Sequence, residues 1–519
     1  MNLLHFILLA ILSFSIILNC LYMMSSMNSL EIVQDMGIGY NLGNTFDSFD
    51  FITEINTPKE QITLMGNILP TKNMIKKIKR YGFKTIRFPV TWVFFIDDYG
   101  NINSDWMILV KEVVDLIVNL DLYCILNVYN DGNYENWLSM GLEAKDKYIN
   151  LWAQIANEFK DYNEHLIFES MNEVFFYNYE ILSYEYDILF TLNQAFIDTI
   201  RNSGGNNVQR LLIVAGADSN LDFTCSSDYK IPIDPSNKLA VSINYYEPTR
   251  FTREFYFEPY IWTDLDGNEY YFSPTLSWGN SEEYFRIITD FEIMKNTFVN
   301  KGIPIIINEV GVYTEEKKEI ESIREYLYMV FSISSDINGI MSCLWDTSNK
   351  QFGNMNFYDR ENDKWYDEKL KENFMQISRG KYIKPMDFYI KTHFETITMT
   401  FLQGAIEMKI GGRKALKIII NVRVIGTLFI DANFIIMTYD LFGNSFQIKF
   451  GKSDGKKQYD GTYVFSIDVS KIKCYNYIQV YIDDTLNHIV LNNLTVEFEE
   501  SFGSIDSKSY KASISKYIY

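Results

Sequence analysis

The stretch His165-Leu-Ile-Phe-Glu-Ser-Met-Asn-Glu173 is a short, mainly apolar run that ends on the polar pair Asn172 and Glu173. Amphipathic stretches flank it, with apolar residues at three- and four-residue spacing, at Tyr148–Phe159 and Ile181–Asn202. A short apolar run between two helical periods is typical of a βα unit, in which a strand of a parallel sheet is followed by a helix. The stretch therefore predicts a parallel strand that carries polar residues at its carboxyl end.

The same alternation recurs along residues 35–376, with further predicted helices at Lys72–Tyr81, Asp105–Leu120, Ser281–Val299 and Lys317–Ile333. The predicted strands are Gly37–Leu42, Thr85–Phe88, Leu122–Val128, His165–Met171, Arg210–Ala215, Leu239–Tyr246, Pro304–Glu309 and Gly339–Trp345. Eight βα units in series predict an α/β fold, a (β/α)8 TIM barrel over residues 31–378. The segment Glu247–Gly279, rich in Tyr, Phe and Pro, is expected to be a loop insertion at the top of the barrel.

The helical spacing stops near residues 379–387, and short alternating runs such as Tyr463–Val469 and Tyr477–Ile482 follow. Short strands separated by turns over residues 388–499 predict a C-terminal β-sandwich, either a carbohydrate-binding module or a spacer. Residues 500–519 are polar and are expected to form a flexible tail.

The N-terminal segment is nearly continuous apolar sequence from Leu3 to Met24. This pattern predicts a signal peptide within residues 1–28, with an uncleaved signal anchor as the alternative. We therefore expect a secreted, extracellular protein, or one held at the cell surface if the segment is not cleaved.

Composition excludes several classes of protein. The chain has 519 residues, 47% of them apolar, which is too apolar for a disordered protein. Its 67 acidic and 47 basic residues give a net charge of -20, which repels phosphate backbones and disfavours nucleic-acid binding. Five cysteines and four histidines show no metal-ligand spacing, so no metal and no organic cofactor is expected, and the protein is predicted to be a monomer.

Polar residues at the strand ends are the candidate site residues, because the carboxyl ends of barrel strands converge on one face. Two of them, Glu173 and Glu309, are carboxylates on the fourth and seventh predicted strands. Other predicted strand ends supply Arg87, Asn130, Asn172, Asn244, Tyr246 and Trp345. Two carboxylates at one rim favour acid–base or nucleophilic chemistry over a structural role for either one.

Five stretches resemble glycoside hydrolase family 5, the cellulase family of the large clan of retaining glycosidases. They are Met36–Asp47, Gly82–Trp92, Phe168–Glu173, Ile305–Gly311 and Trp345-Asp346 before Phe352-Gly353. They occur in the family's order over residues 31–376, and the first is most similar to endoglucanases acting on β-1,4-glucans. The resemblance implies a polysaccharide substrate, a β-glucan, and cleavage by two glutamates.

The resemblance also implies a role for each candidate residue. Glu173 is expected to be the acid/base and Glu309 the nucleophile of a double-displacement mechanism, which needs one protonated and one ionised carboxyl group. Arg87 is expected to keep Glu309 ionised and Tyr246 to orient it. Asn172 is expected to bind the sugar 2-hydroxyl.

Tryptophans are the other candidates for sugar contacts. Trp345 is expected to form the stacking floor under the sugar at the cleavage site. Trp92 and Trp137 could be further platforms or part of the barrel core, and the sequence leaves both readings open.

The chain departs from the family where its members usually carry histidines. The usual histidine pair after the third strand is Tyr129-Asn130 here, and the histidine after the sixth strand is Asn244. Both replacements keep hydrogen-bonding groups but remove a titratable cation. Three hypotheses follow: an endoglucanase with altered activity, a glucan-binding pseudoenzyme, and a transferase that uses the same covalent intermediate. The glucan linkage remains open.

Overall fold

The computed structural model describes residues 27–382, apart from residues 50–52, 54, 133–136, 175–182, 254–259, 264–268, 273–274, 280, 315–317 and 349–354, and describes only strands after residue 382. The predicted signal segment thus lies almost wholly outside the described residues. The chain divides into two compact units, Met1–Gly279 with Asp290–Tyr382, and Asn280–Thr289 with Ile383–Tyr519. Among the residues described, no helix has the length and apolar character needed to cross a membrane.

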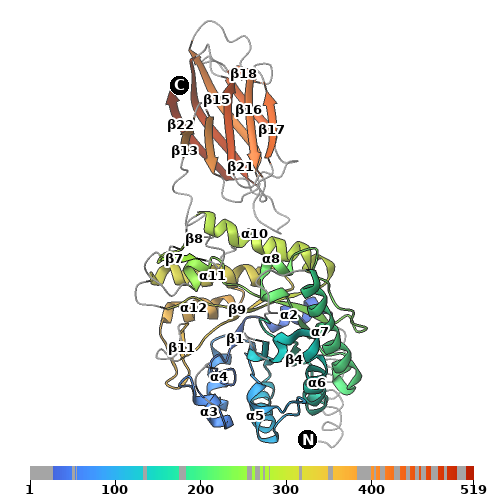
Figure 1. The fold of residues 1–519 in the computed structure, drawn as a ribbon. Coiled ribbons are helices and arrows are strands. Elements are labelled where there is room, and N and C mark those ends of the chain that lie inside the picture. The colour runs from blue at the N-terminus through green and yellow to red at the C-terminus, as the bar shows by residue number, and fades with distance from the viewer. Residues whose placement is uncertain are drawn as a thin grey trace, which may run out of the picture. The chain divides into compact units, whose positions relative to one another are not determined.

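The first unit is built on a closed barrel of parallel strands (Figure 1). Its eight strands are β1 (Gly39–Asn41), β2 (Thr85–Phe88), β3 (Tyr123–Asn127), β4 (Leu166–Glu169), β5 (Leu212–Ala215), β6 (Leu239–Asn244), β9 (Ile305–Val310) and β10 (Ile340–Leu344). Each pairs in parallel with its neighbours, and β10 closes the barrel on β1. The predicted TIM barrel is confirmed: seven of the predicted strands contain an observed strand, and β9 runs one residue beyond its predicted end at Glu309.

Helices surround the barrel, as the periodicity predicts. The described ones are α2 (Ser29–Met36), α3 (Pro58–Thr63), α4 (Lys72–Arg80), α5 (Ser104–Val118), α6 (Lys145–Phe159), α7 (Ser183–Asn202), α8 (Leu221–Thr224), α9 (Thr249–Thr252), α10 (Ser281–Thr297), α11 (Ile320–Asp336) and α12 (Glu368–Ile377). In α5, the Asn103 side chain caps the first turn by accepting from the backbone of Asp105 and Trp106. Its apolar stripe, from Trp106 to Ile117, is buried.

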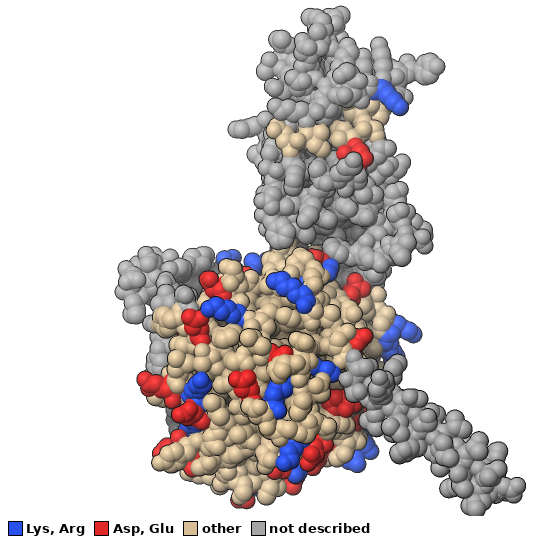
Figure 2. Space-filling model, turned by 90° about the vertical axis from the view of Figure 1, so that its right-hand side faces the viewer, with Lys and Arg blue, Asp and Glu red and all other residues tan. Residues whose placement is uncertain are grey.

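Two antiparallel hairpins lie outside the barrel. One pairs β7 (Tyr260–Thr263) with β8 (Glu269–Phe272), within the segment predicted to be an insertion, and the other pairs β11 (Tyr358–Asp359) with β12 (Lys364–Trp365). On the face drawn in Figure 2, Lys and Arg lie scattered among Asp and Glu over the described part of the barrel.

The barrel interior changes from apolar to polar along its strands. Ile125 on β3, Ile167 on β4 and Ile306 on β9 belong to one buried apolar cluster, which also includes Ile32 and Met36 of α2. Side chains two positions apart on a strand point to the same face. The next inward-facing residues of these strands are Asn127, Glu169 and Asn308, all buried. A polar layer therefore lies above the apolar one, nearer the carboxyl ends of the strands.

The second unit contains two five-stranded antiparallel sheets. One has the order β13 (Met399–Leu402), β14 (Ala405–Lys409), β20 (Tyr477–Asp483), β16 (Asn433–Tyr439), β17 (Ser445–Phe450). The other has the order β18 (Gly455–Lys457), β19 (Tyr463–Asp468), β15 (Ala415–Ile425), β21 (His488–Phe498), β22 (Tyr510–Ile518). Two such sheets are the components of a β-sandwich, and both the sandwich and the function of this module remain predictions.

The last strand corrects one expectation. Residues 500–519 are predicted to be a flexible tail, but β22 pairs with β21 from Phe498↔Tyr510 to Val490↔Ile518. The polar composition of this segment hid its period-two alternation, Ala512-Ser-Ile514-Ser-Lys-Tyr-Ile518, which is compatible with an edge strand.

Candidate active site

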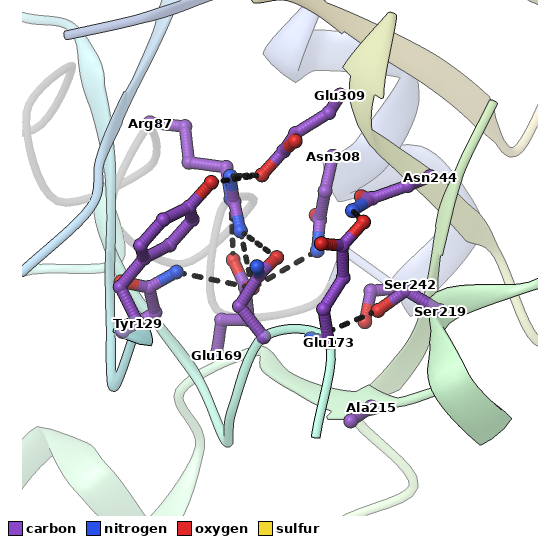
Figure 3. Close-up of polar contacts among 12 residues, drawn as sticks. Arg87, Tyr129, Glu169, Glu173, Ala215, Ser219, Ser242, Asn244, Asn308 and Glu309 are labelled. Carbon is purple, nitrogen blue, oxygen red and sulfur yellow. Dashed lines mark hydrogen bonds and ion pairs between the residues drawn. The ribbon is translucent and has the colours of Figure 1, made fainter. Parts of the chain in front are cut away.

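Arg87 on β2 is the centre of the polar layer and is fully buried. Its Nε and Nη2 atoms donate to the two carboxylate oxygens of Glu169, each at 2.7 Å. Nη1 donates to Oε1 of Glu309 and to Oδ1 of Asn41, each at 3.0 Å, and Nη2 also donates to Oδ1 of Asn172 at 2.7 Å. Burial disfavours its charge, but Glu169 and Glu309 outweigh that effect, so the pKa of Arg87 lies well above its usual value. Figure 3 shows this cation between the two carboxylates.

Glu169 on β4 is a buried counter-ion with no exposed surface. Its Oε1 atom also accepts from Nδ2 of Asn308 at 2.9 Å and from Nδ2 of Asn127 at 3.2 Å. Because both oxygens are occupied by protein donors, Glu169 fixes the Arg87 guanidinium rather than facing a substrate. A forked pair of this kind fixes the orientation of the guanidinium group and also compensates its charge.

Glu309, on β9, accepts hydrogen bonds on both carboxylate oxygens. Oε1 accepts from Arg87 and, at 2.8 Å, from the Tyr129 hydroxyl, and Oε2 accepts from the Tyr246 hydroxyl at 2.9 Å. Burial raises the pKa of Glu309 to about 7, and Glu173 adds to the rise, while Arg87 and the two phenols act in the opposite direction. Three donors, one of them a cation, favour the ionised carboxylate that a nucleophile needs.

Glu173 follows β4 in a different environment. Its Oε1 accepts from Nδ2 of Asn244 at 2.7 Å, and its backbone N–H donates to Oγ of Ser219 at 3.3 Å. Its side chain is half-buried, and among the described residues no basic group hydrogen-bonds to it. Glu173 has a φ of 34°, in the left-handed region that is costly for a residue with a side chain. Such strain is typical of functional sites, where the surrounding structure holds a side chain in place.

Asn172 and Trp345 each contact a residue that hydrogen-bonds to Glu309, namely Arg87 and Tyr129. Asn172 uses its Oδ1 to accept from Arg87, so its amide N–H groups are turned away from that contact. Trp345 follows β10, is half-buried, and stacks parallel to Tyr129 with ring centroids 5.7 Å apart and 6° between planes. The indole is therefore fixed in orientation before any substrate binds.

Three other candidates have structural contacts. Asn130 donates through Nδ2 to the backbone oxygen of Asp47 at 2.6 Å, which ties the loop after β3 to the loop after β1. Trp92 is fully buried, and its Nε1 donates to the backbone oxygen of Asn127. Of its two possible roles, sugar platform or barrel core, the structure therefore favours the barrel core. Trp137 is half-buried and donates through Nε1 to Asp131 at 2.8 Å. Among the described residues, no three His, Cys, Asp or Glu side chains are grouped to hold a metal ion.

The model of the cellulases of glycosyl hydrolase family 5 matches residues 45–351, which include every barrel strand except β1. The chain belongs to glycosyl hydrolase family 5. The family resemblance noted in the sequence is thereby confirmed, and this chain is a glycoside hydrolase.

Other members of family 5 are similar to this chain over the part that contains the barrel. Endoglucanase A of Clostridium longisporum is 34% identical over 368 residues, which cover 67% of this chain and 65% of the relative's length. The solved structure of a broad-specificity endoglucanase from an uncultured bovine rumen ciliate is 52% identical, with a TM-score of 0.66, and covers 68% of this chain and 99% of that one. A broad-specificity endoglucanase from Ruminococcus champanellensis, solved with bound cellotriose, is 28% identical with a TM-score of 0.59, covering 67% and 98% of the two chains.

Two residues that hydrogen-bond to Arg87 or Glu309 are not among the predicted site residues, namely Glu169 and Tyr129. Glu169 was counted within an apolar strand, although a carboxylate two residues after the inward-facing Ile167 could have been assigned to the barrel interior from the period of two. The sequence places Tyr129 at the end of the third strand, in place of a family histidine, but no local signal connects it with Glu309, which lies 180 residues further along the chain.

Proposed function

We propose that this protein is a retaining endo-β-1,4-glucanase in which Glu309 is the nucleophile and Glu173 the acid/base. The observation that carries the proposal is the unequal environment of the two glutamates. Within the described part of the chain, Glu309 accepts three hydrogen bonds, one from Arg87, whereas the Glu173 carboxyl accepts a single one, from Asn244. The first environment stabilises a negative charge on the attacking group, and the second leaves an oxygen free to carry a proton.

The proposed reaction has two displacements. In the first, Glu309 attacks the anomeric carbon while Glu173 gives its proton to the leaving oxygen. In the second, Glu173 removes a proton from water, and the resulting hydroxide displaces Glu309 from the sugar. Arg87 keeps Glu309 in position, Asn172 is placed to bind the sugar 2-hydroxyl, and Trp345 supports the ring by stacking.

The substrate class rests on the relatives, whose names describe endoglucanases, two of them of broad specificity. We therefore expect hydrolysis within β-1,4-linked and mixed-linkage glucan chains. The test is to incubate the purified full chain with carboxymethylcellulose, mixed-linkage glucan, xyloglucan and mannan and to measure reducing ends, with Glu309→Ala as the inactive control. Proton NMR of the first product should show the β-anomer, and first-formed α-product would contradict a retaining mechanism.

A glucan-binding pseudoenzyme is the second candidate, favoured by the replacement of the family's histidines by Tyr129, Asn130 and Asn244. It predicts no new reducing ends on any of the four polysaccharides but retained binding to insoluble glucan. Products longer than the substrate would instead indicate transfer to a sugar acceptor.

We include export from the cell in the proposal, because a polymeric glucan lies outside the cell. The apolar run from Leu3 to Met24 supports this location. Expression with a C-terminal tag, followed by N-terminal sequencing of protein from the medium and the membrane fraction, distinguishes a cleaved signal from an anchor.

A further inference from the structure

Tyr129 contacts three parts of the site at once. Its hydroxyl donates to Oε1 of Glu309 at 2.8 Å, and its ring stacks parallel to that of Trp345. The Arg87 guanidinium lies 5.5 Å from the centre of the same ring. The side chain thus connects the nucleophile, the cation that holds it and the proposed sugar floor, and it does so at a position where the family usually has a histidine.

We propose that Tyr129 is a positioning residue for the nucleophile, which holds Oε1 of Glu309 and thereby assigns Oε2 as the attacking atom. A carboxylate oxygen has two lone pairs in the carboxylate plane. Oε1 accepts two hydrogen bonds, from Arg87 and Tyr129, whereas Oε2 accepts one, from Tyr246. Counting donors from the described residues, Oε2 is the oxygen that keeps a lone pair without a protein donor. This inference rests on the proposed retaining mechanism.

The covalent step then follows from these contacts. A lone pair of Oε2 forms the bond to the anomeric carbon, while the bond from that carbon to the glycosidic oxygen breaks and its electron pair stays on that oxygen. The glycosidic oxygen takes the proton of Glu173. Oε1 becomes the carbonyl oxygen of the ester, and Arg87 and Tyr129 remain in place as its donors. Hydrolysis by water reverses the bond changes at Oε2.

A phenol and an imidazole differ in one respect that an experiment can detect. Burial raises the pKa of Tyr129 well above its usual value, with Glu309 adding to the rise, so the phenol stays protonated over the working pH range. It therefore donates to Glu309 without ever adding a positive charge, whereas a histidine would titrate near neutral pH. The acidic limb of the activity profile should then report Glu309 itself.

The groups that face Glu309 come from six parts of the barrel. They are Arg87 on β2, Tyr129 after β3, Glu173 after β4, Tyr246 after β6, Arg253 after α9 and Cys343 on β10, while Asp47 after β1 faces Tyr129. Removing the Tyr129 hydroxyl leaves the others in place. It takes away one donor that favours the ionised form of Glu309, so the carboxyl should hold its proton to a higher pH.

The experiment compares Tyr129→Phe with Tyr148→Phe in the full chain. Tyr148 is a matched control, because it is also buried and its hydroxyl donates to the backbone oxygen of Ser170 at 2.9 Å rather than to any carboxylate among the described residues. We expect Tyr129→Phe to lower kcat about 10- to 100-fold with KM within about twofold, because the lost donor acts mainly on the attacking group. The acidic limb of kcat/KM should move up by about 0.5–1 pH unit. Tyr148→Phe should change neither kcat nor the acidic limb of kcat/KM. An unchanged acidic limb in Tyr129→Phe overturns the proposal.

The attacking atom is tested by trapping. A crystal structure of the enzyme treated with 2,4-dinitrophenyl 2-deoxy-2-fluoro-β-cellobioside should show the sugar on Oε2 of Glu309, with Oε1 still bound by Arg87 and Tyr129. A bond to Oε1 overturns the assignment.

Failure of the proposed function is distinguishable from failure of this inference. If the wild type releases no reducing ends, the proposed function fails, and the role of Tyr129 is then measured by thermal unfolding between pH 5 and pH 8. The unfolding temperature of Tyr129→Phe should fall further over this range than that of the wild type or Tyr148→Phe. Equal falls in the three proteins contradict the proposal whether or not the protein is active.

Discussion

Glu309 should make the protein less stable as the pH rises, because it is a buried carboxyl group that must ionise. Its pKa in the folded protein is raised to about 7 from an ordinary value of 4.5. The folded state therefore binds the Glu309 proton more tightly than the unfolded state does. The stability that this proton contributes is fully present below pH 4.5 and is lost as the pH rises through 7. A difference of roughly 2.5 units corresponds to about 3 kcal/mol of unfolding free energy.

The substitution that tests this is Glu309→Gln, which keeps the shape of the side chain but does not titrate. Its amide oxygen can still accept from Arg87 and Tyr129. Between pH 5 and pH 8 the wild type should lose about 3 kcal/mol more stability than the variant, or about 5 °C of unfolding temperature for a domain of this size. Asp47, Asp131 and Asp218 also have raised pKa values, but they are present in both proteins and cancel in the comparison.

The assay is differential scanning calorimetry of the full chain, followed by urea unfolding at the two pH values. Glu361→Gln, at an exposed glutamate, is the matched control for the chemical change and should follow the wild type. Parallel curves of unfolding temperature against pH for wild type and Glu309→Gln would refute the reasoning. They would mean that Arg87 and the two phenols offset the cost of burial completely.

Three further predictions concern the surrounding residues and metals. Glu169→Ala should lower the unfolding free energy by about 3–5 kcal/mol, measured by urea unfolding, because it removes the forked partner of the fully buried Arg87; a loss below about 1 kcal/mol would show that Glu309 alone can hold the cation. Trp345→Ala should raise KM for cello-oligosaccharides about 10-fold, the value of one aromatic stacking contact, and Trp345→Phe should lie between it and the wild type. Dialysis against EDTA should leave the rate of glucan hydrolysis unchanged, since the proposed mechanism uses the two carboxylates alone, and a rate restored only by added divalent cation would contradict that mechanism.

Most of the barrel could be predicted from local sequence because parallel strands buried on both faces are short apolar runs. The run Pro304–Glu309 and the run Gly339–Trp345 fall on β9 and β10 without help from any distant contact. The C-terminal strand β22 was missed for the converse reason. Its alternating residues are mostly polar, so composition suggested a tail, and only the pairing with β21 marks it as a strand.

The candidate site was predictable to the extent that it lies at strand ends. Glu173, Arg87 and Glu309 follow from the rule that barrel strands converge at their carboxyl ends. The rule brings them to one rim but does not say which side chains touch. It placed Asn130 among the substrate-binding candidates, and the structure adds that its Nδ2 donates to the backbone oxygen of Asp47.

The sequence by itself determined the barrel, the family and the two glutamates, because each is encoded in a local run of residues that can be recognised without its neighbours. Only the tertiary structure decided how the glutamates differ. Glu309 is distinguished by donors from β2, from the loop after β3 and from the end of β6, which closure of the barrel brings together. The structure also shows what one of the residues in place of the usual histidines contacts. At one of the three positions, Tyr129 donates to Glu309, the proposed nucleophile, and this contact depends on the distance across the barrel and is not written in the sequence on either side of it.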